Sequence, residues 1–213
     1  GAYQTIFGGG SADAFLAKFD GSGARQWATY YGGISDDYGY SIATDGSANV
    51  YLTGATSSTS GIATSGAYQT TWGGASVVWG DAFLVKFDGL GIRQWATYYG
   101  GTNDDVGYSV ATDGMGNVYM SGWTISTSGI ASTGAYQTTF AGATDAFLVK
   151  FDISGIRQWA TYYGSDDQGI SIAADGLGNV YMTGKTSSTS GMASSGAYQI
   201  SGGGNYDAYL VKF

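Results

Sequence analysis

The chain has 213 residues, including 38 Gly, 18 Tyr and 9 Phe, and it contains no Pro, Cys, His or Glu. Without His, Cys or Glu it cannot form a Ser-His-Asp or Cys-His catalytic arrangement, or a zinc site built from the usual nitrogen and sulfur ligands. The net charge of −8 argues against nucleic acid as a partner, and no apolar run approaches the roughly 20 residues that span a bilayer, so membrane insertion is not expected.

Four sequence markers recur along the chain and divide it into repeats. Gly-Ala-Tyr-Gln begins at Gly1, Gly66, Gly134 and Gly196. Asp-Ala-(Phe/Tyr)-Leu begins at Asp13, Asp81, Asp145 and Asp207. Arg-Gln-Trp-Ala-Thr-Tyr-Tyr-Gly begins at Arg25, Arg93 and Arg157, and Asp-Gly-x-x-Asn-Val-Tyr begins at Asp45, Asp113 and Asp175. A long, nearly fixed period of this kind indicates a solenoid, a propeller or a linear array.

From the N-terminus, residues 1–33 are expected to carry the third and fourth strands of a partial blade. Residues 38–100 and 107–164 form two complete four-stranded blades, and residues 169–213 carry the first three strands of another partial blade. In the blade at 107–164 the expected strands are 108–112, 118–121, 146–151 and 157–163. The turn Asp113 to Asn117 favours a hairpin, because Asp-Gly and Gly-Asn tolerate positive φ. The long stretch 56–80 is expected to be a loop ordered by Ala67, Tyr68 and Trp72.

The expected strands are apolar on both faces, and this selects the architecture. In residues 82–87, Phe83, Val85 and Phe87 point to one face while Ala82 and Leu84 point to the other. A sheet with one wet face would instead alternate apolar and polar residues. Each sheet is therefore expected to be covered on both sides, as in sheets stacked around an axis. We predict an all-β fold, a β-propeller-type array of four-stranded antiparallel blades, with a sandwich as the alternative.

The expected strands do not complete a ring. They number 13, or about three and a quarter blades, whereas closed propellers have roughly 4 to 8. Three explanations are open: the chain is a section of a longer protein, it closes a ring with a second copy, or its sheets stack openly. The expected partners are therefore other repeats of the same chain or of a second chain, because an unpaired terminal strand invites pairing.

Any acid–base or cation chemistry must come from Asp, because all 16 acidic residues are Asp. Adjacent pairs precede the first strand of each blade, and they are Asp36-Asp37, Asp104-Asp105 and Asp166-Asp167. Two carboxylates about 5 to 9.5 Å apart can hydrolyse glycosides, and Asp-rich loops can bind Ca²⁺. These pairs are copied in every blade, however, while an active site needs an asymmetric set of groups. We therefore expect no catalytic residue and no cofactor, with a Ca²⁺ site at the pairs as the alternative.

Three Trp residues break the repeat and are the candidate ligand-binding residues. Trp72 stands where other copies have Phe, Trp79 lies in the insertion 76–79, and Trp123 replaces Ala55 and Lys185 of the other copies. Exposed aromatic rings can stack on sugars or anchor a protein partner. Alternatively, these rings fill gaps beneath the long loops.

The repeats resemble the bacterial SBBP β-propeller repeats. The residues that carry the resemblance are the segments 41–54, 81–88 and 93–101, and copies of them cover essentially the whole chain. The resemblance implies large secreted or cell-surface bacterial proteins built from repeated blades, and it implies no common reaction.

Three functions follow as hypotheses. The first is a non-enzymatic extracellular structural or adhesion module, acting as a scaffold, stalk or interaction surface. The second is a carbohydrate-binding, lectin-like propeller that uses the non-repeated aromatic residues to bind glycans or a surface protein. The third, a glycoside-active enzyme using paired Asp, requires a cleft that gathers carboxylates.

Overall fold

A computed structural model describes residues 2–74 and 79–213, and these residues form thirteen strands. The strands are β1 (Ala14–Phe19), β2 (Arg25–Tyr31), β3 (Asp37–Thr44), β4 (Val50–Thr56), β5 (Asp81–Phe87), β6 (Arg93–Tyr99), β7 (Asp105–Thr112), β8 (Val118–Thr124), β9 (Asp145–Phe151), β10 (Arg157–Tyr163), β11 (Asp167–Ala174), β12 (Val180–Thr186) and β13 (Asp207–Lys212). The described residues contain no helix, and hence none suited to crossing a bilayer. The all-β prediction and the number of strands are confirmed.

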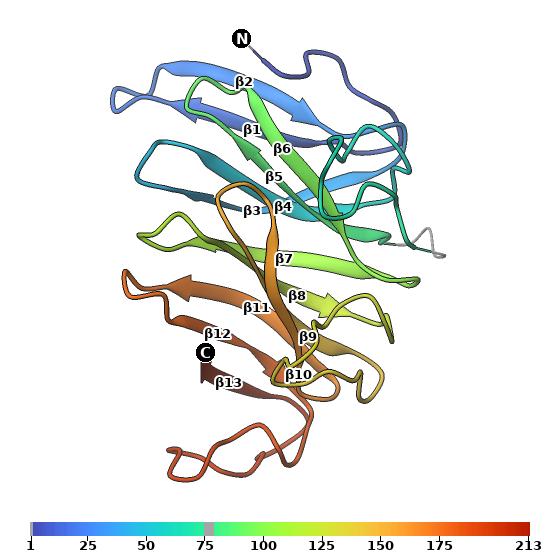
Figure 1. Ribbon diagram of the computed structural model, residues 1–213, viewed down its shortest axis with the longest axis vertical. Coiled ribbons are helices and arrows are strands. Elements are labelled where there is room, and N and C mark those ends of the chain that lie inside the picture. The colour runs from blue at the N-terminus through green and yellow to red at the C-terminus, as the bar shows by residue number, and fades with distance from the viewer. Residues whose placement is uncertain (1, 75–78) are drawn as a thin grey trace.

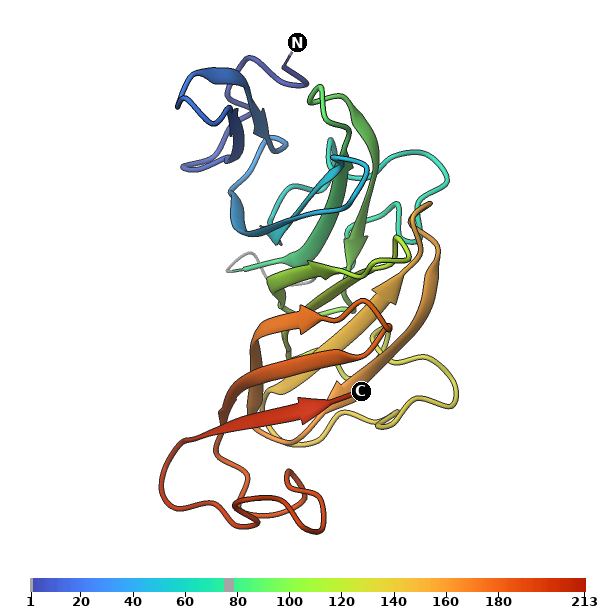
Figure 2. The ribbon, with the colours of Figure 1, turned by 90° about the vertical axis from the view of Figure 1, so that its left-hand side faces the viewer.

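The strands form four antiparallel sheets. The N-terminal sheet is β1-β2, the second sheet is β3-β4-β5-β6, the third is β7-β8-β9-β10, and the C-terminal sheet is β11-β12-β13. Figure 1 shows the sheets following one another down the long axis, from the N-terminal sheet at the top to the C-terminal sheet at the bottom. In the side view of Figure 2 the first and last sheets lie at opposite ends of the stack, so the chain does not close a ring.

The first two strands of each complete sheet are longer than the sequence predicts. In the third sheet, β7 begins at Asp105 rather than residue 108, and β8 ends at Thr124 rather than residue 121. Gly122 is a strand residue here, not the start of a loop: it pairs with Gly107 and Phe147, and a Cβ at this position would collide with the carbonyl oxygen of Val106. Glycine is needed because the backbones approach closely.

The inner junctions are packed as the two-faced strands predict. In β5, the face with Phe83, Val85 and Phe87 packs in one cluster with Ala14 and Leu16 of the N-terminal sheet. The opposite face, with Ala82 and Leu84, packs in a second cluster with Phe147, Val149 and Phe151 of the third sheet. All seven residues of β5 are buried. The structure is not a two-sheet sandwich, because each sheet packs against the next one along the chain.

The outermost faces of the stack do not follow this pattern. Phe15 of β1 is 72% exposed, whereas Phe83, its equivalent in the second sheet, is fully buried. Leu210 of β13 is 77% exposed, whereas its equivalent Leu84 is fully buried. The expectation that every sheet is covered on both sides is therefore wrong for the N-terminal and C-terminal sheets.

Candidate functional site

The two members of each Asp pair lie in different environments. The first member binds a loop of the preceding sheet: the carboxylate of Asp36 accepts from the backbone N–H of Ser11, and that of Asp104 accepts from the N–H of Gly80, at 3.2 Å. Asp166 accepts from the N–H of Ala143 in the same way. These first members connect each sheet to a loop of the sheet before it. The two carboxylates of an adjacent pair therefore do not act together as one acid–base unit.

The second member of each pair is buried at the start of the first strand. Asp105 opens β7, and its Oδ2 accepts hydrogen bonds from the N–H of Gly101 at 2.7 Å and from the hydroxyl of Ser126 at 2.9 Å. At the preceding junction, Asp37 accepts from the hydroxyls of Thr56 and Ser58 and from the N–H of Gly33. Asp167 is also fully buried.

Each buried second member faces an Asp from the sheet before it. Asp81 and Asp105 lie on either side of Gly100, where a Cβ would be 3.0 Å from the carboxyl carbon of Asp81 and 3.1 Å from that of Asp105. Asp13 and Asp37 flank Gly32 in the same manner. We call these sets the junction carboxyl pairs: Asp13–Asp37, Asp81–Asp105 and Asp145–Asp167. This pairing has no direct signal in the sequence, because the partners are separated by more than 20 residues of chain.

Within each junction carboxyl pair, the Asp at the head of the third strand lacks a partner on one oxygen. Oδ2 of Asp145 accepts from the side-chain amide of Gln137 at 2.9 Å and from the N–H of Ala141 at 2.8 Å. Its Oδ1 is buried with no hydrogen-bond partner, and the Oδ1 atoms of Asp13 and Asp81 are in the same state. The Oδ1 atoms of Asp105 and Asp167 also have no hydrogen-bond partner. The threonines paired with them across the sheet, Thr124 and Thr186, stand at the position from which Thr56 donates to Asp37.

Burial makes ionisation of these carboxyl groups costly. It raises the pKa of Asp81 to about 6, and that of Asp105 and Asp145 to about 7. The negative charge of Asp167 adds to the increase at Asp145, and burial also raises the pKa of Asp37 and Asp167. Two buried carboxyls that face each other can hold one proton between them. Protonation of Asp145 would supply the hydrogen that its Oδ1 atom lacks.

The position of the junction carboxyl pairs weighs against glycoside hydrolysis. They recur at successive junctions between sheets rather than being gathered in one cleft, and all their members except the half-buried Asp13 are buried. No three acidic side chains in the described part of the chain are placed to hold a metal ion together. The Ca²⁺ alternative therefore has to rely largely on backbone oxygens, and it stays a prediction for metal titration to test.

A second group of Asp residues orders the hairpins between first and second strands. Oδ1 of Asp45 accepts from the N–H groups of Ser47 and Asn49, and its Oδ2 accepts from the side-chain amide of Asn49 and the hydroxyl of Tyr51. Burial opposes ionisation of Asp45, but these hydrogen bonds outweigh it and lower its pKa. The turn interpretation of the Asp-Gly-x-x-Asn motif is confirmed, because both carboxylate oxygens are already engaged.

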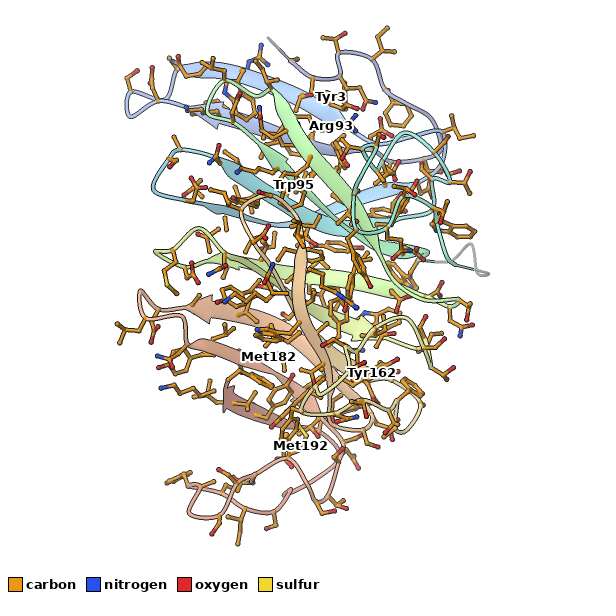
Figure 3. The ribbon with its side chains drawn as sticks, viewed as in Figure 1. Tyr3, Arg93, Trp95, Tyr162, Met182 and Met192 are labelled. Carbon is orange, nitrogen blue, oxygen red and sulfur yellow. The ribbon has the colours of Figure 1, made fainter. Side chains whose placement is uncertain are left out.

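The repeated cationic and Trp side chains fasten neighbouring sheets. Trp95 of β6 donates its indole N–H to the carbonyl of Ile153 in the third sheet at 3.0 Å, and Lys86 donates to the same carbonyl at 3.2 Å. The guanidinium of Arg93 lies over the ring of Tyr3, 4.4 Å from its centroid (Figure 3). Trp95 is therefore half-buried at a junction rather than fully in the core. The markers that contain Tyr3 and Arg93 recur together along the sequence, and this shared recurrence is the sequence feature that points to their contact.

The three non-repeated Trp residues do not share one environment. Trp72 is half-buried and packs against the core of the second sheet, and its indole nitrogen is enclosed. Trp123 of β8 is also half-buried with an enclosed nitrogen. Trp79 is 40% exposed, and residues 75–78, which include the first three residues of its insertion, lie outside the described residues. Of the three rings, that of Trp79 is the exposed one, and ligand binding by it stays a prediction.

A partly exposed aromatic row extends from Trp79 along the first strands of the second and third sheets; Trp79 and Tyr40 are exposed, and Tyr38 and Tyr108 are half-buried. The ring of Trp79 lies 6.4 Å from that of Tyr38, and Tyr38 stacks on Tyr40 at 6.3 Å and 3°. Tyr40 in turn meets Tyr108 edge-on at 5.5 Å. This row is not evident from the sequence, because Tyr40 and Tyr108 belong to different sheets and meet only when the sheets stack.

Comparison with known proteins places these features among repeat proteins. The family model described as "SBBP: Beta-propeller repeat" matches residues 26–62, 94–129 and 158–191, one match for each copy of the Arg-Gln-Trp segment. An uncharacterized WD repeat-containing protein, L264, of Acanthamoeba polyphaga mimivirus is 26% identical over 174 residues, which are 76% of this chain and 12% of that protein. Regulatory protein FlaEY of Caulobacter vibrioides is 28% identical over 136 residues, 62% of this chain and 14% of that protein. The chain thus spans only a small part of these relatives.

Proposed function

Because the chain belongs to the SBBP β-propeller repeat family, we propose that it is a non-enzymatic scaffold that works outside the cell, as a stalk or an adhesion surface. The observation that carries this proposal is the use of its charged side chains. The junction carboxyl pairs, the hairpin Asp residues and all Lys and Arg residues except Lys185 recur with the repeat, and they hold turns and sheets together. A chain whose charges are engaged in this way has few groups left for catalysis.

The relatives support a scaffold and do not define a reaction. One carries a name that refers to WD repeats and the other a name that refers to regulation. Because the matched segments are only 12% and 14% of those proteins, we transfer no activity from them. The extracellular location is part of the proposal, and the resemblance to secreted and cell-surface repeat proteins supports it.

Surface labelling tests the location. Intact cells that produce the protein are treated with a membrane-impermeant biotin reagent, and the labelled Lys residues are mapped by mass spectrometry. We expect labelling of the exposed Lys185 on intact cells, or recovery of the protein from the medium, with a cytoplasmic marker protein as the control. Labelling that appears only after lysis would remove the extracellular part of the proposal.

Glycan binding is the second candidate, and the partly exposed aromatic row favours it. The exposed rings of Trp79 and Tyr40 are of the kind that stack on sugars, and the half-buried rings of Tyr38 and Tyr108 pack beside them. A glycan array with the wild-type chain and the Trp79→Ala variant is the direct test. Trp123→Ala is the matched control, because that ring lies half-buried. Binding that Trp79→Ala leaves unchanged would exclude this row as the glycan site.

A further inference from the structure

The partly exposed aromatic row occurs at one place in the stack, where β3 and β7 lie side by side. Two of its members, Tyr38 and Tyr40, lie two positions apart on β3, and their rings are parallel to within 3°. In β11 the equivalent positions hold Gln168 and Ile170, and that sheet forms without the row. Because the repeat does not copy the row, building a sheet does not require it. The row is therefore available to bind a ligand.

Elsewhere in the chain, aromatic rings are partners of cationic side chains. Six of the eight Lys and Arg side chains lie over a Tyr ring, 4.4 to 5.6 Å from its centroid. The other two, Lys18 and Arg25, belong to the N-terminal sheet. In the part of the chain that the structure describes, no Lys or Arg lies over a ring of the aromatic row. The row is thus an aromatic cluster that has ring faces for a cation and receives none from its own chain.

A carboxylate lies at the edge of the aromatic row. The hydroxyl of Tyr38 donates to Oδ2 of Asp36 at 3.4 Å, and Oδ1 of Asp36 accepts from the backbone N–H of Ser11. Burial raises the pKa of Tyr38, and the negative charge of Asp36 adds to the increase. The net charge of −8 has the same sign as this carboxylate. Electrostatics at the row therefore favour a positively charged ligand and oppose a negatively charged one.

These two features together select among glycans. A neutral sugar offers the apolar face of its ring to an aromatic side chain. A sugar with a free amine also carries an ammonium group, which both an aromatic face and the carboxylate of Asp36 attract. An acidic sugar would instead place a second negative charge beside Asp36. Successive ring centroids of the row are 5.5 to 6.4 Å apart, so the row is long enough for an oligosaccharide.

We propose that the aromatic row binds glycans that carry free, protonated amino groups, such as oligomers of glucosamine; this rests on glycan binding, the second candidate function, and names its ligand class. The sugar rings lie on the exposed rings of Trp79 and Tyr40. An ammonium group lies beside Asp36 and the ring of Tyr38. The binding is non-covalent and needs no co-reactant.

Isothermal titration calorimetry with the intact 213-residue chain tests the ligand class. Three β-1,4-linked tetramers, of glucosamine, N-acetylglucosamine and glucose, differ only in the group on the second carbon of each sugar. At about pH 6, where the amines are protonated, we expect the glucosamine tetramer to bind about tenfold more tightly than the other two. This advantage should shrink as salt is raised from about 50 mM to about 500 mM.

The other outcomes separate the ligand class from glycan binding itself. Equal binding of the three tetramers would overturn the preference for amino groups and leave glycan binding in place. Absence of binding of all three at about 1 mM would remove both. Tetralysine is the charge control, because it carries ammonium groups without sugar rings. Tetralysine that binds as tightly as the glucosamine tetramer would overturn the proposal, since charge alone would then explain the selectivity.

Tyr40→Ala tests whether the aromatic row is the site. We expect this variant to bind the glucosamine tetramer about fivefold more weakly, because it loses one exposed ring face. Ile170→Ala is the matched control, since Ile170 stands at the same position in β11 and is 46% exposed. A Tyr40→Ala variant that folds, as judged by its Tm, and binds as tightly as the wild type would overturn the proposal.

Asp36→Asn tests the position of the ammonium group. Asn removes the charge and keeps an oxygen that can accept from Ser11, so we expect affinity for the glucosamine tetramer to fall about threefold. Affinity for the N-acetylglucosamine tetramer should not change. Asp166→Asn is the matched control, because Asp166 accepts from the N–H of Ala143 in the same way and has no aromatic row beside it. Equal losses for the two variants would overturn the proposal, because they would show an effect of net charge rather than of this carboxylate.

Discussion

Substitution of Asp145 by Asn is predicted to stabilise the protein at neutral pH. Burial, and then the charge of Asp167, raise the pKa of Asp145 to about 7, whereas the unfolded chain titrates near 4. The folded protein therefore holds this proton more tightly than the unfolded chain. The contribution of this carboxyl to stability is greatest below about pH 4 and is lost as the pH rises through about 7.

The magnitude follows from the size of the pKa difference. A change of about three units corresponds to roughly 4 kcal/mol when the group is ionised at pH 8. An Asn at this position keeps an oxygen where Oδ2 accepts from Gln137 and Ala141, and places an N–H where Oδ1 has no donor. Because Asn supplies permanently the hydrogen that protonation supplies at low pH, the gain should approach 4 kcal/mol at pH 8 and fall below about 1 kcal/mol at pH 4.

Urea unfolding at pH 4, 6 and 8, followed by Trp fluorescence, measures this difference. Asp113→Asn is the matched control, because burial opposes ionisation of Asp113 but hydrogen bonds from Asn117 and Met115 lower its pKa. That variant should lose stability at pH 8 and little at pH 3, the opposite sign. A gain for Asp145→Asn that does not change with pH, or a loss at pH 8, would refute the shared-proton interpretation.

Three further predictions concern packing and surface residues. Phe147→Ala should lower the free energy of unfolding by about 3 to 5 kcal/mol, measured by urea denaturation, because the ring is fully buried at the junction of the second and third sheets. Gly122→Ala should abolish two-state unfolding or lower Tm sharply in calorimetry, because its Cβ collides with the carbonyl of Val106; Gly114→Ala, in an open hairpin, is the control. Trp79→Ala should change stability by less than about 0.5 kcal/mol, since its ring is 40% exposed, and a larger loss would show that the ring supports the fold.

The fold could be predicted because the sequence carries its pattern several times. Strands such as β9 and β10 were expected within one residue of their observed ends, since apolar residues on both faces and turn residues at fixed offsets agree in every copy. The start of β7 was missed, because Asp105 has low strand propensity and is tolerated there only through its hydrogen bonds to Gly101 and Ser126.

The candidate site was less predictable than the fold. Sequence adjacency suggested that Asp104 and Asp105 form a pair, but alternation along an extended chain sends neighbouring side chains in different directions. The actual partner of Asp105 is Asp81, which reaches it only when consecutive sheets stack. Trp72 and Trp123 were recognised as departures from the repeat, and only three-dimensional packing distinguishes them from the exposed Trp79.

Because the junction carboxyl pairs recur at every interface between sheets, the number of protons that an array takes up should depend on its number of repeats. Each additional sheet in such a stack adds one interface with two carboxyls. Because burial raises the pKa of Asp81 to about 6 and that of Asp105 and Asp145 to about 7, we expect each inner interface to take up a proton as the pH falls through this range. Potentiometric titration of arrays with different numbers of repeats should then give a stoichiometry that grows in whole steps with the number of interfaces. Longer arrays would accordingly respond more steeply to mild acidification than short ones, although no single interface differs between them.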